Sequence, residues 1–164
     1  IMGTRCGIID ANIVPYIMKK EGLTPDEMTD ILNKKSGFIG LSGKSSDMRD
    51  VVGFAEGGDE RAQLVVDKLV LDITKLVAAY IAELGGVDLI VFTAGIAENN
   101  PWLREDVCKN FEWMGIKIDK EVNDRTRDAA IISAADSTAK VALIPTDEEL
   151  MIARDTMRLT KDLK

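Results

Sequence analysis

Histidine is missing from the 164-residue chain, and cysteine is scarce. Without histidine the chain supplies no His general base, no Ser–His pair and no His metal ligand. Cys6 and Cys108 lie far apart and have no metal-ligand spacing, so we expect two reduced thiols of a cytoplasmic protein. The sequence also lacks an apolar run of the roughly 18 residues that span a bilayer and has no signal peptide. We therefore expect no membrane partner.

Positive charge is in short supply too. Lys and Arg number 21 against 28 Asp and Glu, which gives a net charge of −7. This balance argues against nucleic acid or an anionic membrane surface as the main partner. A phosphate ligand is still compatible with it, because a few local arginines can hold one on an acidic protein. Apolar residues make up 46%, enough for the core of one domain of ordinary size.

Apolar periodicity and cap residues predict an α/β fold. Helices are expected over residues 13–21, 24–35, 47–56 and 60–84, from Asn100 and from Thr146, and strands over 89–94, 115–119 and 141–144, with a glycine loop at 36–46. Three strands are few for an independent sheet. A start at Ile1 rather than Met suits a piece of a longer protein whose first strands lie upstream.

Several of these elements carry sharper expectations. Thr24 and Glu27 predict a capping box, and so do Thr146 and Glu149. Ser46 is expected to cap the helix over 47–56. The helix over 60–84 is apolar over so wide an arc that we expect it to be buried on most sides. The apolar run over 89–94 predicts a strand buried on both faces, as in a parallel sheet.

Gly43-Lys44-Ser45 looks like the end of a phosphate-binding P-loop, but the spacing fails. That motif needs a glycine five positions before Gly43, where Phe38 stands. The segment also follows a predicted helix, whereas a P-loop follows a strand. We therefore expect a flexible glycine loop.

Four segments in order resemble the acetate kinase family, which belongs to the superfamily of sugar kinases, heat-shock protein 70 and actin. They are Gly3-Thr4-Arg5-Cys6-Gly7, Ser45-Ser46-Asp47-Met48-Arg49-Asp50, Phe92-Thr93-Ala94-Gly95-Ile96-Ala97-Glu98-Asn99 and Ile144-Pro145-Thr146-Asp147-Glu148-Glu149-Leu150. The resemblance covers the whole chain. It implies that residues 1–164 are the C-terminal nucleotide-binding and dimerisation domain of a two-domain kinase, with a ribonuclease H-like, actin-like ATPase fold lacking its first strands. The N-terminal domain, with its own catalytic groups, would be absent.

The sequence departs from the family pattern at four positions. Ile8 stands where the family has an acid, Ala11 where proline is usual, Ala97 where glycine is usual and Asp147 where asparagine is usual. None of these gives a reason for lost activity. Alanine at position 97 is unexpected if the turn there needs a positive φ, because glycine adopts that conformation far more readily.

The resemblance implies reversible phosphoryl transfer between ATP and acetate, giving acetyl phosphate and ADP, with Mg²⁺ or Mn²⁺ as the metal. It also implies a homodimer through this domain, which would explain the apolar helix over 60–84. One alternative is a kinase of the same family for propionate or another short-chain carboxylate. Another is a non-catalytic nucleotide-binding or dimerisation module.

Two N-terminal motifs receive site roles from this resemblance. Arg5 would stabilise the transition state, because a fixed guanidinium can hold the charge on the transferred phosphoryl group. Without the resemblance, the sequence favours a surface arginine paired with Asp10. Asp47, Met48 and Arg49 would lie beside the nucleotide, with Asp47 accepting hydrogen bonds and Arg49 stacking on adenine. Their plain reading is an acid near a helix start and an exposed base.

Two C-terminal motifs complete the expected site. The turn formed by Gly95, Ile96, Ala97, Glu98 and Asn99 would bind adenosine at the carboxyl end of a strand, although it also reads as a plain turn. The resemblance assigns Glu148 to Mg²⁺, which takes one or two carboxylates with water and phosphate oxygens. The alternative is a solvated acid that favours the helix dipole. Glu149 is left to the capping box.

Overall fold

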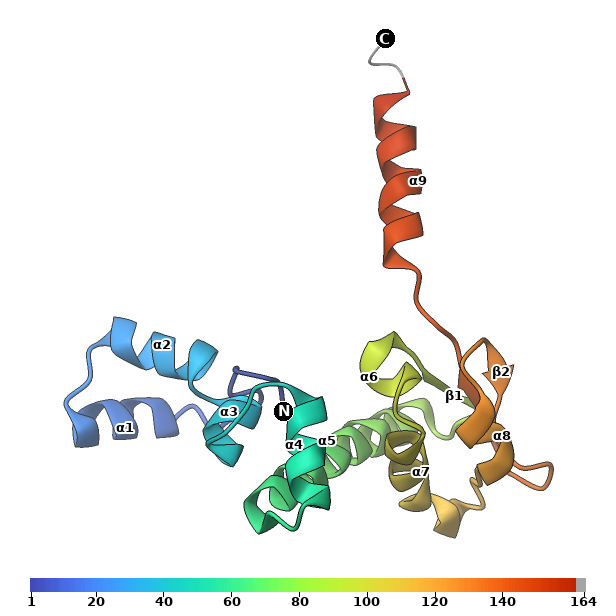
Figure 1. Ribbon diagram of the computed structural model, residues 1–164, viewed down its shortest axis with the longest axis horizontal. Helices are drawn as coiled ribbons and strands as arrows, with labels where there is room; N and C mark the ends of the chain where they lie inside the picture. Colours follow the sequence, from blue (N-terminus) through green and yellow to red (C-terminus); the bar gives the residue numbers. More distant parts are fainter. Residues whose placement is uncertain (162–164) are drawn as a thin grey trace. The chain divides into compact units, whose positions relative to one another are not determined.

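The computed structural model describes residues 1–161, and its internal contacts divide the chain into two compact units, Ile1–Leu76 and Val77–Lys164 (Figure 1). The first unit is helical and the second contains a small sheet. The expected α/β class is confirmed. In the described part of the chain, no helix combines the length and apolarity that crossing a membrane requires.

The N-terminal unit is built from helices in short succession. They are α1 (Ile13–Glu21), α2 (Pro25–Lys34), α3 (Gly37–Ser42), α4 (Met48–Glu56) and the first part of α5 (Glu60–Leu84). Gly22 ends α1 in the left-handed conformation at φ 69°, as a C-terminal glycine should. The predicted capping box at α2 is confirmed, since the Thr24 hydroxyl accepts from Glu27 N–H and the Glu27 carboxylate accepts from Thr24 N–H.

The loop predicted over 36–46 is wrong in part, because α3 forms inside it. Backbone hydrogen bonds from Phe38 N to Met2 O (2.8 Å) and from Ile39 N to Gly3 O (3.1 Å) hold the segment 1–7 against the start of this helix. At Gly37 the chain has φ 62°, and a Cβ there would stand 2.0 Å from Met2 O. The helix α3 therefore depends on the close contact of its backbone with Met2 and Gly3, which lie more than thirty positions earlier in the chain.

Two other expectations for the helical elements need correction. The cap of α4 is Asp47, whose carboxylate accepts from Arg49 N–H at 2.8 Å, and not Ser46. The long helix α5 has the expected bounds, but it is not buried on most sides. Only Ala62, Val65 and Leu69 are buried along its length. Its exposed large apolar residues are Leu64, Leu71, Leu76, Tyr80 and Leu84.

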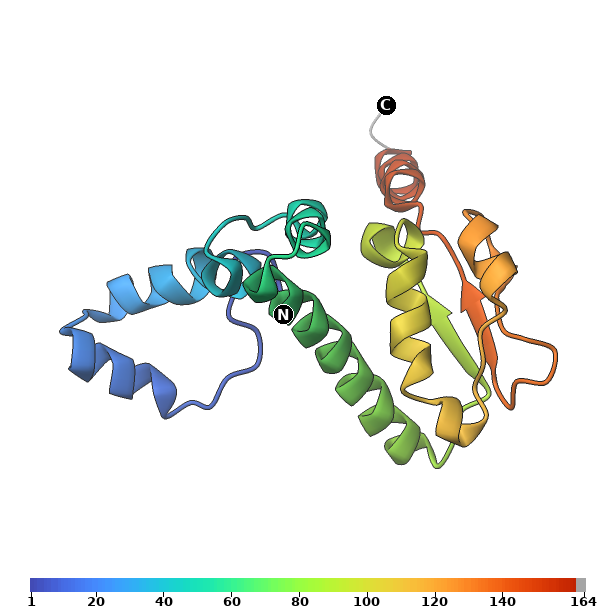
Figure 2. The same ribbon diagram turned by 60° about the horizontal axis from the view of Figure 1, so that its bottom comes forward.

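The C-terminal unit contains a mixed sheet with strand order β1-β3-β2 (Figure 2). Its elements after α5 are β1 (Leu89–Phe92), α6 (Ala94–Glu98), α7 (Pro101–Lys109), the 3-10 helix η1 (Glu112–Met114), α8 (Lys120–Arg125), β2 (Ala130–Ile131), β3 (Lys140–Leu143) and α9 (Glu148–Thr160). Strands β1 and β3 pair in parallel, with Leu89 opposite Lys140, and β2 pairs antiparallel to β3. Neighbouring parallel strands therefore present their carboxyl ends at one edge.

Three predictions fail in this unit. Residues 115–119 form a single bridge, Ile118 to Ser133, in place of a strand, and β2 was not predicted because it is only two residues long. Strand β1 is buried on one face, through Ile90 and Phe92, while its other face is exposed. An apolar run alone does not distinguish one buried face from two.

The core of the C-terminal unit joins α7 to the sheet. Leu103, Val107, Ile116, Val141 and Leu143 are almost completely buried, and Figure 2 shows α7 beside β1. Cys108 lies in this core as a free thiol, and burial raises its pKa to about 12. A thiol in such surroundings is inert at neutral pH.

Candidate functional site

Arg5 lies in the loop that packs on α3, and its side chain is exposed. Hydrogen bonds from Ser36 N to Thr4 O (2.9 Å) and from Cys6 N to Leu32 O (2.8 Å) fix the backbone on both sides of it. In the described part of the chain Arg5 forms no ion pair, and Asp10 accepts from Asn12 N–H. The alternative pairing of Arg5 with Asp10 is therefore not observed.

The same loop contacts the segment that leads into α4. A Cβ on Gly3 would lie 2.9 Å from Ser46 O, so only glycine lets the two backbones approach this closely. Ser46 directly precedes Asp47. The structure thus brings two sequence-predicted motifs, the loop of Arg5 and the segment 45–50, into one region of the N-terminal unit.

Asp47 and Arg49 form an ion pair at the start of α4. Arg49 Nε donates to Asp47 Oδ1 at 3.0 Å, and Nη2 donates to Oδ2 at 2.5 Å. These side-chain bonds, together with the one from Arg49 N–H, lower the pKa of Asp47 to about 2. The Arg49 side chain is 85% exposed, so both faces of its guanidinium are open to a flat ligand. Met48, the residue between them, is half-buried.

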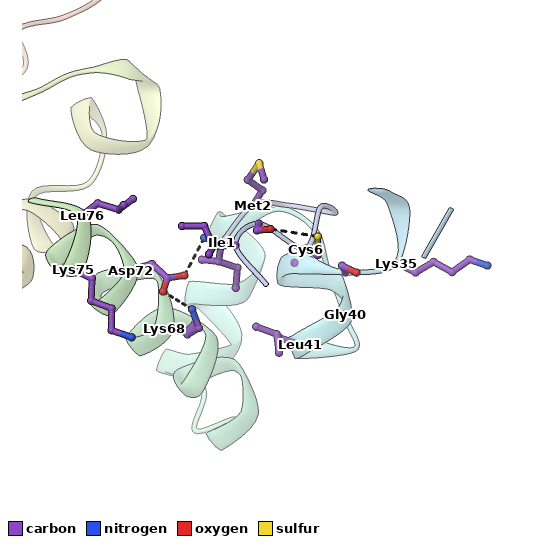
Figure 3. Close-up of a pocket in the computed structure, with 14 residues that line it drawn as sticks. Ile1, Met2, Cys6, Lys35, Gly40, Leu41, Lys68, Asp72, Lys75 and Leu76 are labelled. Carbon is purple, nitrogen blue, oxygen red and sulfur yellow. Dashed lines mark hydrogen bonds and ion pairs between the residues drawn. The ribbon is translucent and has the colours of Figure 1, made fainter. Parts of the chain in front are cut away.

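A cavity of about 720 Å³ lies elsewhere in the N-terminal unit (Figure 3). It contains an ion pair in which the carboxylate of Asp72 accepts a hydrogen bond from Lys68. Burial would raise the pKa of Asp72, but the hydrogen bond from Lys68 lowers it. Cys6 and Gly7 line the cavity and Arg5 does not. The cavity therefore borders the motif of Arg5, but none of the predicted site residues lines it.

The predicted adenosine turn forms the short helix α6 after β1. Ala94, at the junction, has φ 64°, and it is the only residue other than glycine with positive φ in the described chain. Ala97, where the sequence raised that question, lies inside α6 and is 6% exposed, so its side chain faces the core. Gly95, Ile96 and Asn99 are exposed, and Asn99 donates back to Gly95 O at 2.9 Å. A Cβ on Gly95 would meet only the side chain of Asn99, at 3.7 Å, which leaves room for a ligand.

Glu98 connects α6 to the segment before α9. Its Oε1 accepts from Thr146 N–H at 2.8 Å and from the Thr146 hydroxyl at 3.2 Å. The predicted capping box of Thr146 and Glu149 is therefore wrong: Asp147 caps α9 by accepting from Leu150 N–H at 2.9 Å. Glu98 binds Thr146 from 48 positions away, and so this threonine does not form the cap that the local pattern predicted.

Glu148 is the first residue of α9 and is exposed. Within the described chain no group of three or more His, Cys, Asp or Glu side chains could enclose a metal. Mg²⁺ does not require such a cage, because water and phosphate oxygens fill most of its positions. The carboxylate of Glu148 makes no hydrogen bond inside the described chain, and so it fits the role of a single protein ligand.

Arg104 was missed by the sequence interpretation, although it is the most deeply buried charged residue that the structure describes. Nε donates to Asn123 Oδ1 at 2.7 Å, and Nη1 donates to Ala97 O at 2.5 Å. Burial lowers its pKa, as does the positive charge of Arg127, while Asp124 opposes the shift. In the sequence Arg104 is one of several charged residues of α7, and no local signal distinguishes it from its neighbours.

Comparison with known proteins agrees with the motifs. The sequence profile of the Acetokinase family matches residues 1–154. The acetate kinase of Clostridioides difficile (strain 630) is 52% identical over 161 residues, covering 98% of this chain and 40% of that protein.

Solved structures give the same result. The crystal structure of Porphyromonas gingivalis acetate kinase superposes with a TM-score of 0.88 at 44% identity, covering 96% of this chain and 40% of that one. A propionate kinase from Francisella tularensis subsp. tularensis SCHU S4 superposes with a TM-score of 0.85 at 36% identity, covering 94% and 39%. The chain thus spans about 40% of the length of these relatives.

Proposed function

The chain belongs to the Acetokinase family, and from this premise we propose that it is the C-terminal part of a kinase that transfers a phosphoryl group between ATP and acetate. The relatives are named acetate kinases, and they are more than twice as long. The proposal therefore concerns a two-domain enzyme in which this chain provides the nucleotide side of the active site.

One observation carries the proposal. The β1–α6 and β3–α9 junctions follow the carboxyl ends of two neighbouring parallel strands, and Glu98 ties them together through Thr146. Ligands of α/β sheets bind outside the carboxyl ends of their strands. Both junctions carry family motifs, and each exposes motif residues: Gly95, Ile96 and Asn99 at the first and Glu148 at the second.

Roles for the individual residues follow from their surroundings. The adenosine would lie against the open surface at Gly95, Ile96 and Asn99, with Ala97 and Glu98 supporting the turn from behind. Arg49 would stack on the adenine, and Asp47 would orient it through their ion pair. Both carboxylate oxygens of Asp47 bind Arg49, and the side chain is still partly exposed, so it could also accept a hydrogen bond from the nucleotide.

Glu148 and Arg5 would act on the phosphates. A bound Mg²⁺ supplies charge neutralisation of the phosphate oxygens, and Glu148 would provide its protein ligand. Arg5, exposed on a loop whose backbone is pinned on both sides, would donate to the transferring phosphoryl group. A carboxylate oxygen of acetate then forms the new bond to phosphorus as the bond to ADP breaks, and the reverse step regenerates ATP.

Residues 1–164 alone are expected to be inactive, because transfer requires both reactants to be positioned and the family's carboxylate-binding groups lie upstream. The experiment measures acyl phosphate formation, trapped as hydroxamate, from ATP with acetate, propionate or butyrate. Full-length protein should turn over acetate fastest. A clear preference for propionate would favour the alternative suggested by the similarity to a propionate kinase. If the full-length protein turned over none of the three acids, the alternative of a non-catalytic nucleotide-binding module would be favoured.

We further propose that the enzyme is a cytoplasmic homodimer joined through this domain. The large apolar residues Leu64, Leu71 and Tyr80 of α5 are exposed, and a contiguous exposed apolar surface usually marks a partner surface. Two-fold pairing is the commonest way to cover such a surface. Sedimentation of the full-length protein at micromolar concentration should give a dimer that Leu64→Glu or Tyr80→Glu dissociates. A monomer, or a dimer unaffected by both changes, would contradict this proposal.

A further inference from the structure

Arg104 on α7 is completely buried and has no carboxylate partner in the described chain. Its guanidinium is surrounded by oxygens of amide groups instead. Nη1 donates to the carbonyls of Ala97 and Glu98 at 2.5 and 3.1 Å, Nη2 donates to the carbonyl of Asn123 at 2.8 Å, and Nε donates to the Asn123 side chain. A buried charge without a counter-ion is costly. The role of Arg104 is therefore better explained by the positions of the groups that it binds than by a gain in the free energy of unfolding.

Two of the three carbonyls that Arg104 binds, those of Ala97 and Glu98, are at the end of α6. A helix of five residues has few internal hydrogen bonds, and its last carbonyls have no partner within it. Arg104 supplies these partners from α7. Asn123 on α8 completes the arrangement, because its Nδ2 donates to Pro101 O at the start of α7 at 3.0 Å. The short helix is thus held by two neighbouring helices through one side chain.

Glu98 carries this constraint to the opposite side of α6. Its backbone carbonyl is bound by Arg104, and its carboxylate binds the backbone and hydroxyl of Thr146. Thr146 lies two residues before Glu148. A continuous path of hydrogen bonds therefore runs from the core at Arg104, through Glu98, to the start of α9.

We propose that Arg104 is a positioning residue that sets α6 so that one residue, Glu98, fixes the adenosine-facing turn and the metal-side carboxylate Glu148 together. The proposal rests on the proposed function, because it assigns what the two junctions bind. Removing the hydrogen bonds between Arg104 and α6 should weaken the binding of ADP. Part of this decrease in affinity should occur only when Thr146 is present to bind Glu98. Simple core filling by Arg104 would predict lower stability without either effect.

The test measures the dissociation constant for ADP by calorimetry, with and without Mg²⁺, in the full-length protein. Arg104→Lys keeps the charge but not the fork that reaches several carbonyls, and should raise the dissociation constant about tenfold, as the loss of a charge-assisted hydrogen bond does. Thr146→Val should raise it about threefold, and only when Mg²⁺ is present. The matched control is Arg125→Lys, since Arg125 is an exposed arginine on α8 whose side chain donates to Glu121 O alone among the residues that the structure describes. It should leave the dissociation constant unchanged both with and without Mg²⁺.

The double variant Arg104→Lys/Thr146→Val decides whether one path connects the two residues. With Mg²⁺, the combined effect should be smaller than the product of the single effects, since both interrupt the same chain of bonds. The proposal is overturned if the increase in the dissociation constant of the double variant equals the product of the two single increases. It is also overturned if Arg104→Lys lowers the melting temperature but leaves the ADP affinity within twofold of the parent protein.

A second pair of variants, Glu98→Gln and Thr146→Val, tests the same path of hydrogen bonds if Arg104→Lys does not fold. Glu98→Gln and Thr146→Val alter exposed or half-buried groups, and each should raise the Mg²⁺ concentration needed for half-maximal tightening of ADP, with no further rise when they are combined. Additive effects would overturn the path. Absence of ADP binding by the parent protein would instead reject the proposed function.

Discussion

The two units of the chain hold their candidate site residues in different ways. In the N-terminal unit the side chains of Asp47 and Arg49 bind each other across two positions. In the C-terminal unit Glu98 binds Thr146 across 48 positions, and Arg104 binds Asn123 across 19. The first arrangement is local and exposed, and the second is long-range and anchored in a core. Substitutions in the first should therefore act mainly on the residue changed, whereas substitutions in the second should spread to other groups.

Arg5→Ala tests the exposed N-terminal loop and should have the largest effect on activity. An interaction made only in the transition state lowers kcat and leaves KM for ATP almost unchanged. Loss of one such donor typically costs about a hundredfold or more. Arg5→Lys should restore little, since lysine lacks the planar fork. Steady-state kinetics of the full-length enzyme measure this, and a kcat equal to that of an Arg125→Ala control would leave Arg5 as a surface residue.

Glu148→Gln tests the junction of the C-terminal unit. If Glu148 holds the metal, the Mg²⁺ concentration for half-maximal activity should rise about tenfold, as expected when a charged partner is lost. Glu149→Gln is the matched control on the next residue. It should shift neither the Mg²⁺ titration nor stability, because Asp147 and not Glu149 caps α9. A shift with Glu149→Gln alone would reverse the assignment of the two acids.

The ion pair at α4 gives a test by pH. Arg49 holds the pKa of Asp47 at about 2, below the ordinary value of 3.8. Because the folded pKa is lowered, the contribution of Asp47 to stability is complete above about pH 4 and is lost as the pH falls through 2. Carboxyl NMR titration should show Asp47 ionising near 2 and moving toward 3.8 in Arg49→Gln. An unchanged pKa would remove Arg49 as the cause.

The smallest expected effect concerns two alanines of α6, Ala94 and Ala97. Ala94→Gly relieves a left-handed backbone and should raise the free energy of unfolding by about 1 kcal/mol. Ala97→Gly lies inside α6 and should lower it by about 1 kcal/mol. Denaturant titration of the two variants measures the difference. If Ala97→Gly stabilises and Ala94→Gly does not, the backbone of this turn differs from the one described.

Local signals explain which parts of the fold could be predicted. The bounds of α1 and α5 and the capping box of α2 follow from residues a few positions apart. The cap of α9 is Asp147 and not Thr146, and it could not be identified this way, because Glu98 binds Thr146 from 48 residues away. Gly37 shows the same limit, since its helix depends on contact with Met2. Periodicity alone also could not show that one face of β1 is exposed.

The motifs likewise selected the candidate site residues but not their supports. Asp47, Glu98 and Glu148 all stand at junctions, as their motifs indicated. Arg104 and Asn123 carry no motif of their own, and their importance appears only when the turn of α6 is folded against them. Supports of this kind depend on tertiary structure, and a single sequence does not display it.

The proposal that residues 1–164 are the nucleotide side of a two-domain acetate kinase predicts the outcome of one assay, acetyl phosphate formation from ATP and acetate, run side by side for the full-length protein and for residues 1–164. We expect the full-length protein to turn over at about 1 to 100 per second, as kinases do, and residues 1–164 to form no acetyl phosphate while the full-length protein binds ADP. Turnover by residues 1–164 alone, or a full-length protein that binds ADP but phosphorylates no short-chain carboxylate, would contradict it.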